Sequence, residues 1–327
     1  MIRLLLSKFL KILPNPLYNY NSKLLSKLIS NDSLINELII KKRFQTLWRE
    51  SLGYNITKET YKIIKLKTKK EKEFIKASVT IIHKFSLTNC PKSFVSKELI
   101  NYIFIIKKDK SKKFIHELYT EETLPALYNE SSPLDNNFSS LNNKSRIDYW
   151  REKIDLIDEI SLLFTKPSRI YRSNYIDTKY SSPYNPLKSI AYAQRHALNY
   201  NKDFKSFDKE GGDCTNFISQ CINHGGISVS NTWKPYTHPW LRVNELYYYL
   251  LRRGLGQDIT NIKPYPIGSI IQFYSNKKGF FSHSGIITKE LANGDYLYCC
   301  HSYDKINFPL SEIFPLMYDK IRVVEIY

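Results

Sequence analysis

A stretch of turn-forming residues near the middle of the chain constrains its fold more than any other feature. Residues 129–146 read NESSPLDNNFSSLNNKSR, so Ser, Asn, Asp and Pro replace the apolar periodicity found on both sides. This composition is typical of a linker, because it offers few side chains for a core. A chain of 327 residues is long enough for two cores of ordinary size. We therefore predict two domains, residues 1–128 and 181–327, joined by a connector over residues 129–180 with one helix at residues 147–164.

The first predicted domain starts with helical patterns and continues with strand patterns. Residues 1–13 place apolar side chains on one helix face, and residues 20–50 repeat this spacing with a break where Asp32 or Ser33 is a suitable cap. Four later segments are rich in Ile, Val, Tyr and Phe, which favours β-strands: residues 60–67, 74–85, 97–107 and 112–119. Helices followed by an antiparallel meander make an α+β domain. This element order resembles that of NTF2-like domains, in which helices pack on a curved sheet.

The net charge of the chain is +18, and most of it lies in the first predicted domain. Residues 1–125 contain 25 Lys and Arg against 11 Asp and Glu. Such a surface attracts an anionic polymer (nucleic acid, anionic lipid or a cell-wall polymer), although a solvated face without a partner explains the charge equally well. No nucleic-acid-binding motif accompanies the charge, so we do not predict specific nucleic-acid binding.

The start of the chain lacks the pattern of a cleaved secretory signal. Lys8 and Lys11 interrupt its apolar residues, and no small-residue cleavage site follows. The longest apolar run elsewhere, Tyr102–Ile106, is too short for a transmembrane helix. These features favour the cytoplasm. The five cysteines are an odd number at irregular spacing, which predicts neither a disulfide framework nor a structural zinc site.

The densest chemical signal in the chain is the segment GGDCTNFISQ at residues 211–220. Two glycines allow a tight turn, and Asp213 is a suitable cap for a helix that begins at Cys214. A thiol in the first turn of a helix lies near unpaired backbone amides, which stabilise a thiolate and lower the thiol pKa. The same amides can stabilise the oxyanion that forms when a carbonyl is attacked. We therefore expect Cys214 to be a nucleophile supported by Asp213 and Thr215.

A thiol nucleophile needs an imidazole as its base, and two histidines follow in suitable positions. His283 begins a predicted strand over residues 283–288, and His301 ends a second strand over residues 296–301. Asn293-Gly294-Asp295 reads as the turn of a hairpin between them, so antiparallel pairing brings His301 beside His283. His301 then orients the base through its second ring nitrogen. Two other polar residues are alternatives for this orienting role: Asp304 and Asn307.

The second predicted domain resembles a known family over residues 184–327. The order YNPLKSIAYAQRHALNYN, GGDCTNFISQ, PIGSIIQF, HSGIITK and YLYCCHS is similar to that of the amidase domain of NlpC/P60-like cysteine peptidases. One departure is Gly268-Ser269, where such domains often have Gly-Asp. The resemblance implies a papain-like α+β fold, in which the Cys helix packs on a small antiparallel sheet. It also matches Cys214 to the nucleophile, His283 to the base and His301 to the third residue.

The predicted function is hydrolysis of an amide or peptide bond without a metal or organic cofactor. Cell-wall peptides are one class of substrate that the resemblance implies, which leaves the compartment open between cytoplasm and cell wall. Trp233 and Trp240 either line a substrate groove or belong to the core, and Ser284 adjoins the predicted base. The alternative function is an inactive amidase-like module joined to a basic domain that binds an anionic polymer.

Overall fold

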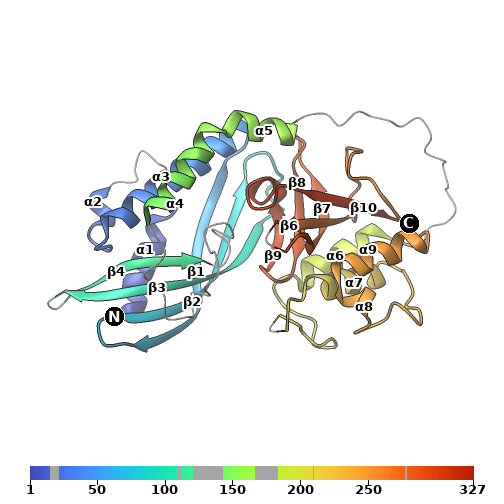
Figure 1. Cartoon of the computed structure of the whole chain (residues 1–327), viewed down its shortest axis with the longest axis horizontal. Helices are drawn as coiled ribbons and strands as arrows, with labels where there is room; N and C mark the ends of the chain where they lie inside the picture. The colour runs from blue at the N-terminus through green and yellow to red at the C-terminus, as the bar shows by residue number, and fades with distance from the viewer. Residues whose placement is uncertain (15–21, 110–111, 121–142, 166–182, 209, 277) are drawn as a thin grey trace. The chain divides into compact units, whose positions relative to one another are not determined.

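The computed structural model describes residues 1–327 except 15–21, 110–111, 121–142, 166–182, 209 and 277. The fold is mixed α+β, with a large antiparallel sheet and several helices (Figure 1). The chain forms two compact units, which we call the N-terminal unit (Met1–Ser93 with Leu99–Leu162) and the C-terminal unit (Phe94–Glu98 with Leu163–Tyr327). The predicted linker and the predicted boundary near residue 180 fall largely outside the described residues, so the domain limits stay a prediction.

Three helices open the N-terminal unit: α1 (Ile2–Ile12), α2 (Ser22–Leu25) and α3 (Asp32–Ser51). The predicted amphipathic helix is confirmed by α1, which buries Leu6, Phe9 and Leu10 in the core of this unit. The predicted break lies at the start of α3, but its cap is Asn31 rather than Asp32 or Ser33. The Asn31 side chain accepts hydrogen bonds from the backbone amides of Ser33 at 3.0 Å and Leu34 at 3.4 Å.

Four long strands confirm the predicted meander: β1 (Ile56–Lys70), β2 (Ile75–Leu87), β3 (Ser96–Asp109) and β4 (Lys112–Thr120). They pair in sequence order and antiparallel, with Leu66 opposite Val79 and Phe104 opposite Leu118. Alternating residues of β2 are buried, as a strand with one face on a core requires. Helices α1 and α3 cover this core, so the predicted α+β arrangement is confirmed, whereas the likeness to NTF2-like domains stays a prediction.

The single helix predicted at residues 147–164 is two helices, α4 (Asn143–Asp155) and α5 (Ile157–Thr165). Trp150 of α4 is 8% exposed and its ring lies 5.3 Å from that of Phe44 on α3. Arg146 of α4 forms an ion pair of 2.8 Å with Glu37 of α3. These contacts join α4 to the N-terminal unit.

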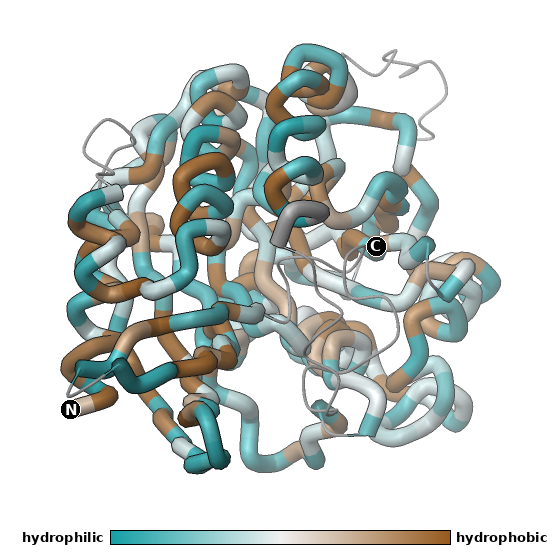
Figure 2. The backbone as a smooth tube through the Cα atoms, turned by 60° about the vertical axis from the view of Figure 1, so that its left-hand side comes forward, coloured by the Kyte–Doolittle hydropathy of each residue, from teal (hydrophilic) through white to brown (hydrophobic). Residues whose placement is uncertain are grey.

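The helices of the C-terminal unit are α6 (Pro186–His196), α7 (Cys214–His224), α8 (His238–Leu241) and α9 (Val243–Arg252). The start of α6 agrees with the sequence, in which Asn185 is a suitable cap and proline a suitable first helical residue. In the structure, the Asn185 side chain accepts a hydrogen bond from the Lys188 amide at 3.1 Å. The sequence also predicts α7, whose buried face includes Phe217, Ile218 and Cys221. Figure 2 shows hydrophobic and hydrophilic residues interleaved along the helices and strands, as amphipathic elements around a core require.

The strands of the C-terminal unit are β5 (Gly256–Asp258), β6 (Ile270–Ser275), β7 (Phe280–Glu290), β8 (Tyr296–Cys300), β9 (Lys305–Pro309) and β10 (Ile321–Ile326), with a 3-10 helix, η3 (Leu310–Glu312). Their spatial order is β9-β8-β7-β6-β10-β5, and all pairs are antiparallel. The first residues of β3 also belong to this unit, because Lys97 and Glu98 pair with Ile306 and Lys305.

Helix α7 packs against β7, which places the predicted nucleophile beside the central strands of the C-terminal unit. The core between them contains Phe217 and Ile218 of α7, Ile270 of β6, Ile286 of β7 and Cys299 of β8. The predicted packing of a Cys helix on an antiparallel sheet is therefore present. A papain-like assignment goes further than this packing and stays a prediction. Among the described residues, no helix is both long and apolar enough to cross a bilayer.

Candidate active site

Cys214 is the first residue of α7 and follows a turn that only glycine accommodates easily. Gly211 and Gly212 have φ angles of +110° and +113°. A side chain at Gly212 would also come within 3.3 Å of the hydroxyl of Ser302. That hydroxyl accepts a hydrogen bond from the backbone amide of Asp213 at 2.6 Å. The glycine pair therefore brings the chain around residue 302 close to the start of the Cys helix.

The thiol of Cys214 is buried beside β7. The residue is 7% exposed, and its sulfur lies 3.8 Å from the hydroxyl of Thr215. Burial raises the pKa of the Cys214 thiol, and the charge of Asp213 adds to this, although hydrogen bonds from Thr215 and from the backbone of Ser284 lower it. The expected lowering of this pKa is therefore wrong for the closed site, because loss of water outweighs the amides of the helix start.

His283 is the fourth residue of β7 and not the first, because the strand begins at Phe280. Its ring packs among Phe273, Tyr303 and Tyr318, with centroid distances of 5.5, 6.0 and 6.3 Å. With the described residues its ring nitrogens form no hydrogen bond. Burial, followed by the charges of Lys305 and Lys278, lowers the pKa of His283 to about 3. The imidazole is therefore neutral at pH 7 and is a weak base in this environment.

His301 lies on the α7 side of the sheet and does not contact the ring of His283. Its Nδ1 lies 2.7 Å from Oδ2 of Asp213, and its Nε2 lies 2.9 Å from the carbonyl oxygen of His196. The ring is stacked between Tyr200 and Phe217, with centroid distances of 3.7 and 4.0 Å. Both ring nitrogens are engaged, so His301 does not orient His283 in this structure as we predicted.

The register of β7 and β8 explains why the two histidines are apart. Ile286 pairs with Cys299, and continuing this antiparallel register by two residues sets His301 opposite Ser284 rather than His283. Directly opposed residues share a face of the sheet, and neighbours along a strand alternate. His301 therefore shares the face of Ile286 and Cys299, which belong to the core beneath α7. A shift of one residue separates the predicted hairpin pairing from the observed one.

Asp213 links the Cys helix to two distant segments. Its Oδ1 accepts hydrogen bonds from the Phe207 amide at 2.8 Å and from the side chain of Asn216 at 2.9 Å. Its Oδ2 faces His301. Asp213 is the N-cap residue by position, but its side chain forms no capping hydrogen bond with the first amides of α7. Those amides are thereby left to other acceptors.

Trp233 and Trp240 form hydrogen bonds with polar side chains of α7. Both are fully buried. The indole N–H of Trp240 donates to Oδ1 of Asn216 at 2.8 Å, and that of Trp233 donates to the Ser219 hydroxyl at 3.3 Å. Complete burial does not fit a groove-lining role, and both residues belong to the core, the second of the two predicted alternatives.

Two small residues let β7 approach its neighbours closely. A side chain at Gly285 would lie 2.7 Å from the ring of Tyr298 and 3.1 Å from the carbonyl oxygen of Cys299. Ser284 is fully buried, and its hydroxyl has no hydrogen-bond partner among the described residues. The Ser284 backbone lies near enough to the Cys214 sulfur to lower the thiol pKa, and the supporting role of Ser284 stays a prediction.

Lys305 is a charged residue near His283 that sequence reasoning missed. It is 1% exposed, and its Nζ lies 3.0 Å from Oε2 of Glu98. The pair is separated by 207 residues in sequence, so no local pattern reveals it. The two predicted alternatives to His301 also lie elsewhere. The Tyr200 hydroxyl donates to Asp304 at 2.8 Å, and Asn307 accepts from Thr288 at 3.0 Å.

Comparison with known proteins gives one family match, and it lies within the C-terminal unit. The family model described as "Putative amidase domain" matches residues 183–327. The chain is also 30% identical over 139 residues to the "Uncharacterized protein YjcM" of Bacillus subtilis (strain 168), a match that covers 38% of this chain and 32% of that protein. The chain thus spans about a third of the length of this relative. No solved structure gives a significant match.

Proposed function

We propose that the C-terminal unit hydrolyses amide bonds, with Cys214 as the nucleophile and His283 as the general base. One observation carries the proposal: the Cys214 thiol, in the first turn of α7, lies near enough to the backbone of Ser284, the residue next to His283, for that backbone to lower its pKa. The first turn of α7 and β7 therefore approach each other one residue away from His283. The similarity of residues 183–327 to an amidase family supports the type of bond. Membership of the NlpC/P60-like superfamily is part of the same proposal.

The pKa shifts oppose ionisation of the thiol in the resting protein, so proton transfer has to accompany attack on the carbonyl carbon. Burial raises the thiol pKa, and burial with two lysines holds the pKa of His283 near 3, so the resting pair is a thiol and a neutral imidazole. On attack, His283 takes the thiol proton while the sulfur bonds to the carbonyl carbon. The imidazolium then returns the proton to the leaving amine as the C–N bond breaks. Water, deprotonated by His283, hydrolyses the resulting thioester and regenerates the thiol.

The oxyanion of this reaction develops beside the start of α7. The first amides of a helix have no intrahelical acceptor, and the Asp213 side chain does not bond to them. Two or three backbone N–H groups near Cys214 are therefore suited to stabilise the tetrahedral intermediate. Loss of one such donor typically reduces the rate by about 10²–10³-fold. Asp213 supports this arrangement indirectly, through its bonds to His301 and Asn216.

Substrate reaches this pair by displacing the turn at Ser302-Tyr303. Tyr303 is 42% exposed, and its ring lies against His283 with a centroid distance of 6.0 Å. Both residues of the turn have positive φ angles, 56° and 87°, which non-glycine residues adopt at a cost. In this proposal, outward movement of Tyr303 admits a carbonyl group. A short peptide, including a cell-wall stem peptide, is the substrate class that the resemblance implies.

The test is hydrolysis of a panel of short peptides and muropeptides by purified full-length protein. We expect Cys214→Ala to abolish product formation and His283→Gln to reduce the rate by about 10²–10⁴-fold, the usual contribution of a positioned base. Cys221→Ala is the matched control, because Cys221 lies on the same helix, is fully buried and faces the core. Hydrolysis that persists in Cys214→Ala refutes the proposal.

A second candidate function concerns the basic N-terminal unit. In this alternative the amidase-like unit is inactive and the N-terminal unit binds an anionic polymer. The observation that favours such binding is the set of exposed lysines on strand β1: Lys58, Lys62, Lys65, Lys67, Lys69 and Lys70. Binding of this kind weakens steeply with added salt, because each neutralised charge releases a counterion. Salt-sensitive binding of a teichoic acid, together with a Cys214 that no substrate acylates, favours this alternative.

A further inference from the structure

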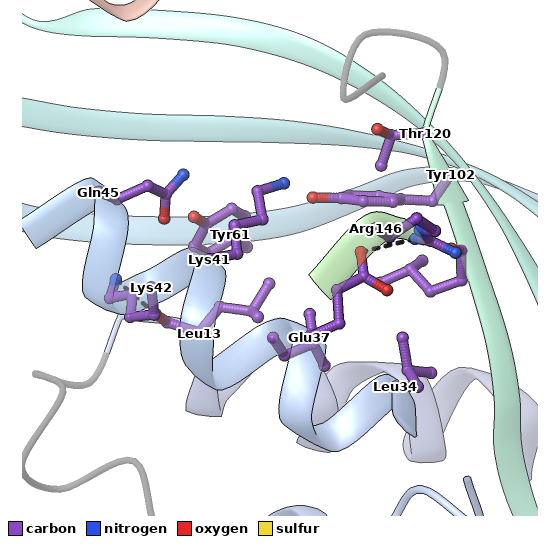
Figure 3. A pocket seen from close by; sticks show the side chains of 12 residues that line it. Leu13, Leu34, Glu37, Lys41, Lys42, Gln45, Tyr61, Tyr102, Thr120 and Arg146 are labelled. Carbon is purple, nitrogen blue, oxygen red and sulfur yellow. Dashed lines mark hydrogen bonds and ion pairs between the residues drawn. The ribbon is translucent and has the colours of Figure 1, made fainter. Parts of the chain in front are cut away.

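The N-terminal unit contains a pocket of about 80 Å³ between helices α3 and α4 and the inner face of its strands (Figure 3). Water needs roughly 10–15 Å³ of such space, so the pocket has room for about five to eight non-hydrogen atoms. Leucine side chains and the rings of Tyr61 and Tyr102 form part of its wall. The pocket is independent of Cys214 and of the C-terminal unit.

The charged groups of this pocket are mainly cationic. Lys41, Lys42 and Arg146 line it together with a single carboxylate, that of Glu37. Lys42 is held by Glu59 at 3.6 Å and by the carbonyl oxygen of Leu13 at 2.9 Å. Figure 3 shows the Lys41 and Tyr102 side chains pointing toward each other. Lys41, whose Nζ lies 5.4 Å from the centroid of the Trp150 ring, adds a positive charge that favours the anionic end of a ligand.

The Glu37–Arg146 pair is incompletely satisfied by the protein. Glu37 is 4% exposed and Arg146 is 6% exposed. One guanidinium nitrogen of Arg146 bonds Oε1 of Glu37 at 2.8 Å and the carbonyl oxygen of Leu118 at 3.0 Å. Oε2 of Glu37 and Nε of Arg146 have no hydrogen-bond partner among the described residues. Most buried polar groups in native proteins have a hydrogen-bond partner, so this acceptor and this donor are available to a ligand.

We propose that this pocket binds a small α-amino acid. The carboxylate of the ligand pairs with Arg146 and Lys41, and its ammonium group donates to Oε2 of Glu37. A short aliphatic side chain, such as that of alanine or valine, lies against the leucines and the tyrosine rings. The dipolar ligand satisfies both unpaired atoms at once. A simple anion leaves Glu37 without a donor, and a simple amine leaves Arg146 without an acceptor.

The test is calorimetric titration of the full-length protein with four probes: L-alanine, D-alanine, propanoate and ethylammonium. We expect one alanine enantiomer to bind with a dissociation constant in the millimolar range or tighter, and at least about tenfold more tightly than propanoate and ethylammonium, because each lacks one charge-assisted bond. Equal binding of all four probes, or binding of none, overturns the proposal and leaves water as the occupant.

Two variants locate the binding in this pocket. Glu37→Gln keeps the oxygen that bonds Arg146 but replaces one acceptor by a donor, so it is expected to remove the preference for alanine over propanoate. Lys41→Met is expected to weaken alanine binding by about tenfold through the lost charge. Lys67→Met, an exposed lysine on β1, is the matched control and is expected to change nothing. Undiminished alanine binding in Lys41→Met and Glu37→Gln also overturns the proposal.

Discussion

The Nδ1 atom of His301 lies 2.7 Å from Oδ2 of Asp213, and this contact joins the end of β8 to the start of the Cys helix. The second ring nitrogen of His301 faces a carbonyl oxygen. A neutral imidazole has a single N–H, so both contacts are satisfied together only when the ring carries two protons or Asp213 carries one. Either way a proton is shared within a fully packed pair, which fixes the backbone immediately before Cys214.

Removal of either member of this pair is expected to destabilise the C-terminal unit. Both residues are 1% exposed, and loss of one partner of a buried pair lowers the free energy of unfolding by about 3–5 kcal/mol. Asp213→Ala and His301→Ala are therefore each strongly destabilising in urea unfolding at pH 7. Their double variant is expected to lose less than the sum by about 1–3 kcal/mol, because both remove the same interaction.

Glu210→Ala is the matched control for this cycle. Glu210 pairs with Lys205 at 2.8 Å, but both side chains are 54% exposed. Exposed pairs contribute about 0–1 kcal/mol, so this change is expected to leave the urea midpoint nearly unchanged. Strict additivity of Asp213→Ala and His301→Ala contradicts the prediction and means that the two side chains act independently.

Alkylation of Cys214 is expected to be slow in the closed protein. Burial raises its thiol pKa above the ordinary value, so only a small fraction of the thiol is ionised at pH 7. Labelling by iodoacetamide, followed by mass spectrometry, should rise with pH without levelling off below pH 9. Cys90 lies partly exposed in the N-terminal unit and is expected to react faster. A plateau for Cys214 below pH 7 contradicts this and indicates a preformed thiolate.

The free energy of unfolding is expected to decrease as the pH falls through a window set by His283. Burial and the neighbouring lysines hold its folded pKa at about 3, whereas the unfolded value is about 6.5. Between these values the unfolded chain binds a proton that the folded protein does not, so stability is lost as pH falls from about 6.5 toward 3. The loss is at most about 1.4 kcal/mol for each decrease of one in pH. His283→Gln lacks this group, and its urea midpoint should depend less on pH over the same window.

The same comparison tests why the pKa of His283 is low. Lys305→Met removes a cation near His283 but also leaves Glu98 unpaired, so Lys278→Ala is the cleaner variant because Lys278 is exposed. We expect Lys278→Ala to raise the folded pKa of His283 slightly. The pH range over which stability is lost then ends at a slightly higher pH. An identical pH slope in wild type and His283→Gln shows that another group controls the acid sensitivity.

Much of the fold follows from local patterns in the sequence. The cap of α6 at Asn185, the apolar face of α1 and the strand composition of β2 each concern neighbouring residues, and each is read correctly. The break that separates α4 from α5 has no such signal, since apolar spacing continues through Leu156. A helix-period pattern reports which face is buried and not whether the backbone is continuous.

The candidate site is less predictable because burial and register decide it. The helix start at Cys214 is predicted correctly from the residues before it, but the thiol pKa of Cys214 depends on how completely water is excluded. His301 is predicted to contact His283, but a one-residue difference in hairpin register moves it to the other face of the sheet. Its actual partner, Asp213, is 88 residues away in sequence.

The buried hydroxyl of Ser284 gives a prediction that separates stability from activity. The residue is fully buried, and an unsatisfied buried hydroxyl lowers stability by about 1–3 kcal/mol. Ser284→Ala removes the hydroxyl and keeps the backbone beside Cys214, so urea unfolding should show a gain of about 1 kcal/mol.

Ser311→Ala is the control, because that buried hydroxyl donates to Asp295 at 2.6 Å and its loss should lower stability by about 1–3 kcal/mol. If Ser284→Ala is destabilised as much as Ser311→Ala, the Ser284 hydroxyl has a partner in solution. If instead Ser284→Ala gains stability and loses hydrolysis, the hydroxyl binds the substrate beside Cys214, and the unsatisfied group is one that the substrate completes.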